Sequence, residues 1–137
     1  QKGPDGKYAI TFPMGDKKLP GIASDDIGKC AYSIFKAGKE YQNKTVGIAG
    51  EHLTGKQMAE AFSKHLGTEV NYNEVPPSVY RSFGFPGAED LGNMFQVNAD
   101  FETEFCRARD INATKKLNPE LINFDTWLNK NKMAIKI

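Results

Sequence analysis

Apolar positions along the first forty residues follow two different periods. Residues 8–12 alternate between apolar and smaller side chains and end at a proline and a Gly-Asp turn, which is typical of a β-strand. From Ile27, apolar residues recur at offsets of three, four, seven and eight, which predicts an amphipathic helix. Ser24 or Asp25 can cap its start, and Gly38 can end it. The predicted core-facing stripe consists of Ile27, Cys30, Ala31, Ile34 and Phe35.

Two stretches on either side of this helix lack a helical period. Residues 17–21 are expected to form a loop, because Lys, Pro and Gly dominate them. Residues 45–49 are short, β-rich and bounded by Gly50. Such a run is typical of a strand that is buried on both faces, as in a parallel sheet.

The helix that follows carries the clearest boundary signals in the chain. Thr54 stands three residues before Gln57, which is the spacing of a capping box. Leu53 and Met58 have the spacing of a hydrophobic staple. Gly67 is the expected left-handed residue at the end of the helix.

The second half of the chain is mostly helical in pattern. A strand over 70–75 ends at two prolines, and a short helix over 78–83 follows. After a break rich in Gly and Pro we expect one long helix, or two joined helices, over 88–105. Asn123 or Asp125 can cap a last helix. This order predicts the α/β class, with too few strands for an independent doubly wound sheet, so the first half is expected to be the tail of a larger one.

Composition narrows the class of protein. The chain has 137 residues, enough for about one domain, and 18 Lys and Arg against 17 Asp and Glu give a net charge of +1. That balance argues against a purely electrostatic grip on nucleic acid or on an anionic membrane. A hydrophobic share of 39% supports a packed core, and no apolar run is long enough for a membrane span. Two cysteines are too few for a disulfide scaffold, which favours a reducing, intracellular setting.

The beginning of the chain and its motifs give no active site. The chain starts with Gln1 in a Gly- and Pro-rich turn, without an initiator Met or a signal segment, which predicts a piece of a longer protein. No Gly-x-Gly-x-x-Gly turn or phosphate-binding loop occurs, so no cofactor-binding residue is predicted. His52 and His65 have no Ser or Cys partner at a recognisable spacing, so no catalytic or metal-binding residue is predicted either. Tyr32 and Lys36 have the spacing of a dehydrogenase pair, but without a cofactor site upstream they are interpreted as a helix face.

Residues 83–95 form the most unusual segment, with four large apolar residues set around Gly and Pro. They are either ordinary core or the wall of an apolar pocket. Together with other segments they resemble the carboxy-terminal half of the NmrA-like family, and its HSCARG-type NADPH sensors most closely. The residues that carry the resemblance are Gln1-Lys2 with Pro4-Asp5-Gly6-Lys7, Gly15-Asp16, Ser24-Asp25 or Asp26 followed by Ile27-Gly28, the run Phe85-Pro86-Gly87-Ala88-x-Asp90-Leu91-x-Asn93-Met94-Phe95, Leu117-Asn118-Pro119 and Asp125-x-Trp127-Leu128.

The resemblance implies an atypical Rossmann-type protein with two domains. Residues 1–50 would be tail segments of the Rossmann-type sheet domain, with the strands at Tyr8 and Thr45 in or beside that sheet. Residues 51–137 would be a smaller, helix-rich domain that binds substrate or partner. Phe85, Met94 and Phe95 would then line the cleft between the domains. NADP(H) would be bound by the full-length parent, with contacts upstream of Gln1, and not by this chain alone.

The resemblance also implies a function. It favours a non-catalytic NADP(H)-responsive redox sensor that acts in regulation, is cytoplasmic and in part nuclear, and can form a homodimer. Its expected protein partner is similar to argininosuccinate synthetase, and no direct contact with nucleic acid or membrane is expected. The predicted partner-binding residues are Lys2, Lys7, Lys17, Lys18 and Leu19. Two alternatives remain, namely an NAD(P)H-dependent reductase of a quinone or a similar small apolar substrate, and a free-standing protein-binding module.

Overall fold

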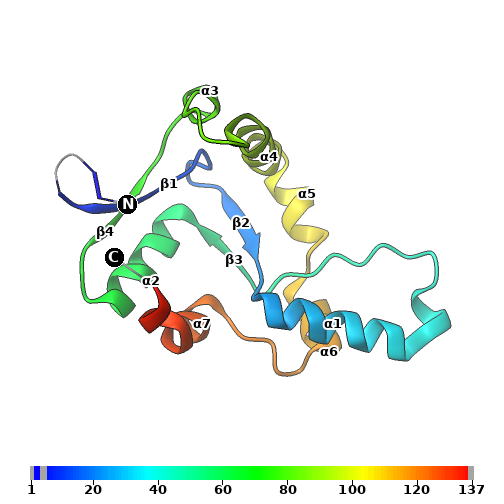
Figure 1. The fold of residues 1–137 in the computed structure, drawn as a ribbon. Coiled ribbons are helices and arrows are strands. Elements are labelled where there is room, and N and C mark those ends of the chain that lie inside the picture. Colours follow the sequence, from blue (N-terminus) through cyan, green and yellow to red (C-terminus); the bar gives the residue numbers. More distant parts are fainter. Residues whose placement is uncertain (1, 4–5, 136–137) are drawn as a thin grey trace.

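The computed structural model describes residues 2–3 and 6–135 (Figure 1). Gln1, Pro4 and Asp5 of the N-terminal turn expected from the sequence lie outside the described residues, as do positions 136–137. The strands are β1 (Tyr8–Thr11), β2 (Lys18–Gly21), β3 (Glu51–Thr54) and β4 (Val70–Asn73). The helices are α1 (Ser24–Ala37), α2 (Gly55–Leu66), α3 (Pro77–Arg81), α4 (Ala88–Asp100), α5 (Glu102–Arg107), α6 (Ile111–Leu117) and α7 (Phe124–Asn131), with the 3-10 turns η1 (Gly38–Tyr41) and η2 (Lys132–Ala134).

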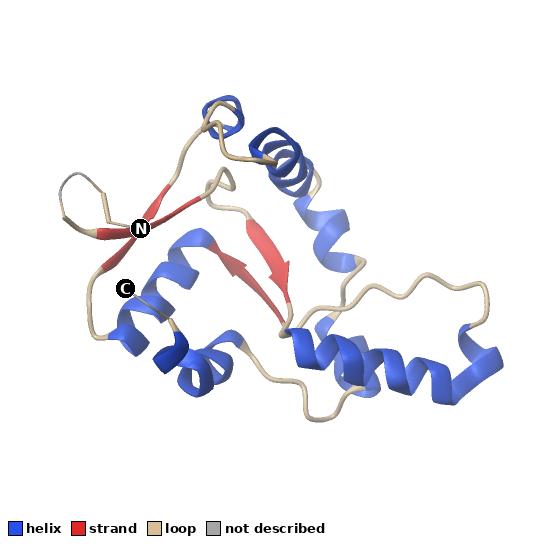
Figure 2. Ribbon diagram, in the orientation of Figure 1, coloured by secondary structure: helices blue, strands red, loops and turns tan. Residues whose placement is uncertain are grey.

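The strands form two separate pairs, and helices surround them (Figure 2). β1 runs parallel to β4, with Tyr8 opposite Val70, and β2 runs antiparallel to β3, with Leu19 opposite Leu53. Helix α2 connects β3 to β4 and packs against both strands. The α/β class expected from the sequence is confirmed. The domain boundary after residue 50 stays a prediction, and both strand pairs join a segment before it to a segment after it.

The signals around α2 act as the sequence predicts. The backbone N–H of Gln57 donates to Thr54 Oγ1 at 3.2 Å, and the backbone N–H of Thr54 donates to Gln57 Oε1 at 2.9 Å. Gly67 ends the helix with a left-handed φ of 67°. The first residue of the helix, Gly55, lies against the ring of Tyr72 in β4, and a Cβ there would collide with the ring. A glycine at this position therefore lets α2 pack closely on β4.

Two strand predictions were wrong. The stretch expected to be a loop forms β2, because Leu19 pairs with Leu53 and tertiary pairing supplies what the local pattern lacks. Residues 45–49, expected to be a strand, form none in the described part of the chain, and the next strand is β3. The two strand pairs of the described residues, β1 with β4 and β2 with β3, do not include residues 45–49. Helix α6 was not predicted at all.

Helix α1 has the predicted bounds, but its start is held by other contacts than the predicted cap. Its N-cap residue is Ala23, without a side-chain cap, so the predicted capping role of Ser24 or Asp25 was wrong. Asp26, which is 2% exposed, accepts hydrogen bonds from Asn118 Nδ2 at 2.8 Å and from the Ile122 backbone N–H at 3.1 Å. The carboxylate therefore ties the start of α1 to the loop between α6 and α7. Of the predicted apolar stripe, Cys30 is fully buried, whereas two other members are exposed.

We predict that Asp26→Asn lowers the free energy of unfolding by about 1–3 kcal/mol. The amide replaces one acceptor oxygen by a donor that faces Asn118 Nδ2 or the Ile122 N–H. Urea unfolding of the chain measures the change. Asp25→Asn is the matched control, because it removes the same charge at an exposed neighbour and should change stability by no more than about 0.5 kcal/mol. Equal effects of the two substitutions would contradict this account.

Candidate functional site

An aromatic cluster lies beside the carboxyl ends of the parallel strands. Phe12, directly after β1, contacts Tyr72 of β4 with ring centroids 4.9 Å apart and Phe95 of α4 with centroids 5.4 Å apart. Phe95 in turn packs edge-on against Tyr80 of α3 at 5.5 Å. Ligands of α/β proteins bind outside the carboxyl ends of parallel strands, so this is the first place to look for a site.

The hydroxyl of Tyr72 is committed to structure. It donates to the Phe12 carbonyl oxygen at 2.8 Å and accepts from the Met14 backbone N–H at 3.2 Å. Burial raises the pKa of this phenol above its usual value. Tyr72 therefore fixes the turn after β1 and is poorly suited to deliver a proton to a ligand at the predicted cleft wall.

The segment between α3 and α4 explains much of the unusual run from 83 to 95. Gly84 and Gly87 have left-handed φ angles of 72° and 88°, and Phe85 between them packs on the Tyr80 ring. Arg81 donates from Nη1 to Asn93 Oδ1 at 3.1 Å and to Gln96 Oε1 at 2.9 Å. A Cβ on the glycine at position 92 would collide with the Arg81 stem. Most of the run therefore builds the turn and its packing.

The three predicted cleft-wall residues lie in one region but face different surroundings. Phe85 and Phe95 both pack against Tyr80, and Phe85 lines an open groove together with Arg81 and Asn93. Met94 is 42% exposed on the outer side of α4. It belongs to a row of exposed apolar side chains that we call the α4 stripe. The α4 stripe consists of Leu91, Met94, Val97 and Phe101.

The α4 stripe lies next to the packed face of the helix. Ala88, Gly92 and Asn98 of α4 are buried, whereas the stripe residues, three of them in α4 and Phe101 as the cap at its end, are between 37% and 57% exposed. Contiguous exposed apolar residues mark surfaces that bind a ligand or another protein. The α4 stripe is therefore the surface at the candidate site that is available for binding. Assigning Phe85, Met94 and Phe95 to a cleft stays a prediction.

The predicted partner-binding lysines fall into two places. Lys2 and Lys7 flank β1: Lys2 Nζ lies 5.1 Å from the Tyr8 ring centroid, and Lys7 Nζ pairs with Glu69 at 3.1 Å. Lys17 and Lys18 stand at the start of β2, beside Glu102 of α5. Lys17 Nζ lies 3.8 Å from Glu102 Oε2, and the Lys18 backbone N–H donates to Glu102 Oε1 at 2.7 Å. Their role in partner binding stays a prediction.

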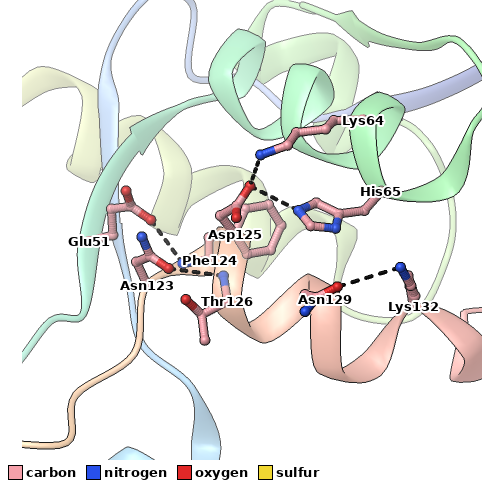
Figure 3. Close-up of polar contacts among 9 residues, drawn as sticks. All are labelled: Glu51, Lys64, His65, Asn123, Phe124, Asp125, Thr126, Asn129 and Lys132. Atoms are coloured by element: carbon pink, nitrogen blue, oxygen red, sulfur yellow. Dashed lines mark hydrogen bonds and ion pairs between the residues drawn. The ribbon is translucent and has the colours of Figure 1, made fainter.

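The remaining predicted partner residue, Leu19, lines an apolar pocket of about 270 Å³. The pocket lies between the β2–β3 pair, the start of α1 and the segment before α7. Polar atoms at its edge already have partners, since Glu51 Oε2 accepts from the Phe124 backbone N–H at 2.9 Å and Asn123 Oδ1 accepts from the Thr126 N–H at 2.9 Å (Figure 3). Sequence reasoning missed this pocket because it depends on β2. The other apolar lining residues include Ile22, Leu53, Met58 and Trp127.

Both histidines have structural partners. His52 lies in β3, and its Nε2 donates to the Arg109 carbonyl oxygen at 2.9 Å. His65 Nε2 and Lys64 Nζ on α2 lie 2.8 Å and 2.7 Å from the same oxygen, Oδ1 of Asp125 on α7 (Figure 3). These contacts clamp α2 to α7. Within residues 2–3 and 6–135, no group of three His, Cys, Asp or Glu side chains is placed to hold a metal ion.

The described residues do not fit the phosphates of a dinucleotide. Such phosphates are held by free backbone N–H groups at a glycine-rich turn between a strand and a helix. Helix α2 directly follows a strand, but its capping box already uses the Gln57 N–H. Helix α1 follows β2 through Gly21, but Asp25 and Asp26 stand in its first turn and would repel a phosphate. In the part of the chain that the structure describes, no buried side-chain nitrogen or oxygen lacks a hydrogen bond. None of its helices is both long and apolar enough to cross a membrane.

Comparison with known protein families shows to which family this chain belongs. The family model described as the NmrA-like family matches residues 1–128. The chain belongs to the NmrA-like family. Among curated proteins, this NmrA-like chain is 28% identical over 104 residues to prestalk A differentiation protein A of Dictyostelium discoideum, which covers 71% of the chain and 34% of that protein.

Solved structures share the NmrA-like fold at low identity. NmrA, a negative transcriptional regulator solved in complex with NADP, superposes with a TM-score of 0.72 at 22% identity, over 95% of this chain and 44% of that one. The triphenylmethane reductase of Citrobacter sp., complexed with NADP(H), has a TM-score of 0.72 at 17% identity, over 93% of this chain and 45% of that one. The NmrA-like chain thus spans less than half the length of these relatives. At such identities the likeness shows the fold alone.

Substitutions at two adjacent positions of α4 should distinguish a packed side chain from an exposed one. We predict that Phe95→Ala lowers the free energy of unfolding by about 2–4 kcal/mol, because it removes the ring between Phe12 and Tyr80. Met94→Ala should cost less than about 1 kcal/mol, because Met94 is exposed. Urea unfolding of both variants checks this. A larger loss for Met94→Ala than for Phe95→Ala would show that the α4 stripe is packed.

The clamp between α2 and α7 predicts a pH dependence. Hydrogen bonds from Lys64 and His65 lower the pKa of the Asp125 carboxyl. Its contribution to stability is therefore complete above the unfolded-state pKa of about 3.9, and it is lost as the pH falls through the lower folded-state pKa. Asp125→Asn should make the unfolding midpoint less sensitive to acid below about pH 4. Asp100→Asn, at an exposed position without an ion pair in the described residues, should leave that sensitivity unchanged.

Proposed function

We propose that this chain forms the ligand- or partner-binding side of an NAD(P)H-responsive regulatory protein and that it does not itself carry out chemistry. One observation carries the proposal. The α4 stripe presents exposed hydrocarbon on the helix whose Phe95 packs on Phe12, directly after β1, while the hydroxyl of Tyr72 in β4 has both its donor and its acceptor capacity in use. A surface of this kind binds apolar groups, and the Tyr72 hydroxyl is not available to donate a proton to them.

Family membership supports the nucleotide part of the proposal. NmrA is a transcriptional regulator and has been solved with NADP and with NAD. Since the described residues of this chain do not fit the dinucleotide phosphates, we place the nucleotide on another part of the natural polypeptide. The nucleotide would then act by favouring one arrangement of that part against this one. The HSCARG-like features, namely response to the NADPH/NADP⁺ ratio, dimerisation and a location in cytoplasm and nucleus, belong to the same proposal.

The identity of the protein partner and its contact surface are also part of the proposal. A protein similar to argininosuccinate synthetase would contact the surface around Lys17, Lys18 and Leu19, with Lys2 and Lys7 on a neighbouring part of the chain. Glu102 and Glu69 partly neutralise these lysines, which favours apolar contact at Leu19 over charge alone. An acidic partner patch is therefore not required.

The alternative function is an NAD(P)H-dependent reductase of a quinone or a similar planar apolar substrate. The same apolar surface favours it, because Phe85 and Met94 could stack against a flat ring system. A triphenylmethane reductase is among the solved proteins with this fold. The proton donor near Phe85 and Met94 would then have to be a group other than Tyr72, whose hydroxyl is already hydrogen-bonded.

We predict that the 137-residue chain binds no NADPH in isothermal titration calorimetry, and that the longest natural polypeptide containing it does. The reason is the absence of a phosphate-holding turn among the described residues. NADPH oxidation by the longer polypeptide, followed by absorbance over a panel of quinones and triphenylmethane dyes, then separates the two functions. No turnover supports the regulatory protein, and turnover of any substrate supports the reductase. Micromolar affinity of the chain alone for NADPH would contradict the placement of the nucleotide on another part of the polypeptide.

A further inference from the structure

The apolar pocket beside β2 has a single charged side chain in its wall. The pocket has a volume of about 270 Å³ and lies between the β2–β3 pair, the start of α1 and the segment before α7. Among the described residues that line it, Glu51 carries the one formal charge, and none is Lys, Arg or His. Leu19, Leu53 and Met58 contribute hydrocarbon to the wall. The pocket therefore combines an apolar lining with one negative group.

Glu51 uses only one of its two carboxylate oxygens in the fold. Oε2 accepts the Phe124 backbone N–H at 2.9 Å, which ties the side chain to the start of α7 (Figure 3). Within the described residues, Oε1 makes no hydrogen bond or ion pair. No buried side-chain oxygen of these residues lacks a partner, so Oε1 keeps accessible surface. It is therefore available to a hydrogen-bond donor from outside the chain.

The space beside Glu51 is open because a side chain is missing there. Gly21 stands opposite Glu51 in the antiparallel register, so side chains at the two positions would lie on the same face of the β2–β3 pair. Gly21 lines the pocket, and a Cβ on it would meet no atom within 4 Å. Its φ is not left-handed, so the backbone does not require glycine at this position. A glycine in a strand can mark a place where a ligand approaches the backbone closely.

Two aromatic rings form the wall on the α7 side. Phe124 and Trp127 are stacked, with ring centroids 6.2 Å apart and an angle of 9° between the ring planes. Phe62 of α2 packs edge-on against Phe124 at 5.3 Å and holds that ring in place. Aromatic faces attract cations. The rings and the Glu51 carboxylate therefore favour an occupant with the same sign of charge, which is positive.

We propose that this pocket binds a small organic amine in its protonated form, with the ammonium group donating to Glu51 Oε1 and the apolar body in the space beside Gly21. The volume limits that body to about one or two rings, since a cavity of about 150 Å³ holds benzene and drug-sized ligands need about 300 Å³ or more. An anionic ligand is disfavoured, because it would meet the Glu51 carboxylate without a cation to offset it.

This site goes beyond the proposed function. It contains no residue of the α4 stripe, and its occupant needs no nucleotide. Of the predicted partner-binding residues, only Leu19 lines it. Amine binding can therefore hold or fail whether or not the longer polypeptide responds to NADPH.

Phenethylamine, which is protonated at neutral pH, is the first probe, and phenethyl alcohol is a neutral control of the same shape. In calorimetry, the longest natural polypeptide containing the chain should bind the amine with a dissociation constant of about 1 mM or tighter. The alcohol should bind about fivefold or more weakly, because it lacks the charge that Glu51 and the rings attract. Equal affinity for the two compounds, or binding of neither, would overturn the proposal.

Trp127 reports where the amine binds, because it is the only tryptophan of the chain and lines the pocket. Titration of the 137-residue chain with phenethylamine should change the tryptophan emission in a saturable way. The probe has a phenyl ring, which does not absorb at wavelengths that excite tryptophan selectively. Amine binding without a change in Trp127 emission would place the amine elsewhere and contradict the assignment.

Two substitutions test the charge and the open space separately. Glu51→Gln keeps an oxygen that can accept the Phe124 N–H, so it should remove the preference for the amine and leave binding of the alcohol unchanged. Gly21→Val fills the space beside Glu51 and should weaken binding of both compounds by about tenfold or more.

The chain offers a matched control for each substitution. Glu60 is exposed on α2 and does not line the pocket, so Glu60→Gln should leave the preference for the amine unchanged. A Cβ on Gly28 would also meet no atom within 4 Å, and Gly28 lies outside the pocket lining, so Gly28→Val should leave both affinities unchanged. A retained preference in Glu51→Gln, or unchanged affinities in Gly21→Val, would overturn the site.

Discussion

The buried carboxylate of Asp26 is the interaction on which the arrangement of this chain depends. A charge that is 2% exposed is costly unless donors surround it, and here Asn118 and the Ile122 N–H supply them. Because Asn118 is itself buried, the pair fixes the loop that leads into α7 as well as the start of α1. This contact therefore holds the start of α1 against the loop between α6 and α7.

The aromatic cluster under α4 holds the elements together at the other end of the molecule. Tyr80 and Phe95 hold α3 and α4 together, and Phe12 connects both to the parallel strands. The segment that most strongly indicated the family is therefore mainly scaffold: its glycines form turns, and Asn93 holds Arg81. This explains how proteins that share the fold can include a transcriptional regulator and a dye reductase.

The local signals around α2 were read correctly from the sequence, whereas the cap of α1 and the signals that depend on distant partners were not. The capping box at Thr54 and the stop at Gly67 need only neighbouring residues, and both are present. β2 depends on pairing with β3, and Asp26 acts through a loop about ninety residues away, so local patterns could not indicate either. For the candidate site, the sequence indicated Phe85, Met94 and Phe95 but could not tell which of them is packed. That distinction comes from Tyr80 and the turn around Phe85.

The parallel pairing of β1 with β4 has a consequence for how the chain acquires its structure. The paired residues are 62 positions apart, with β2, α1, β3 and α2 between them. Closing that loop therefore carries a large entropic cost, which comes before the stabilising contacts between the two strands form. Helix α2, with its own caps, can form early from local contacts, and β4 follows it directly in the chain. β1, the earlier-synthesised strand of this pair, should then find its place late, leaving a transient interval in which β4 is unpaired along one side.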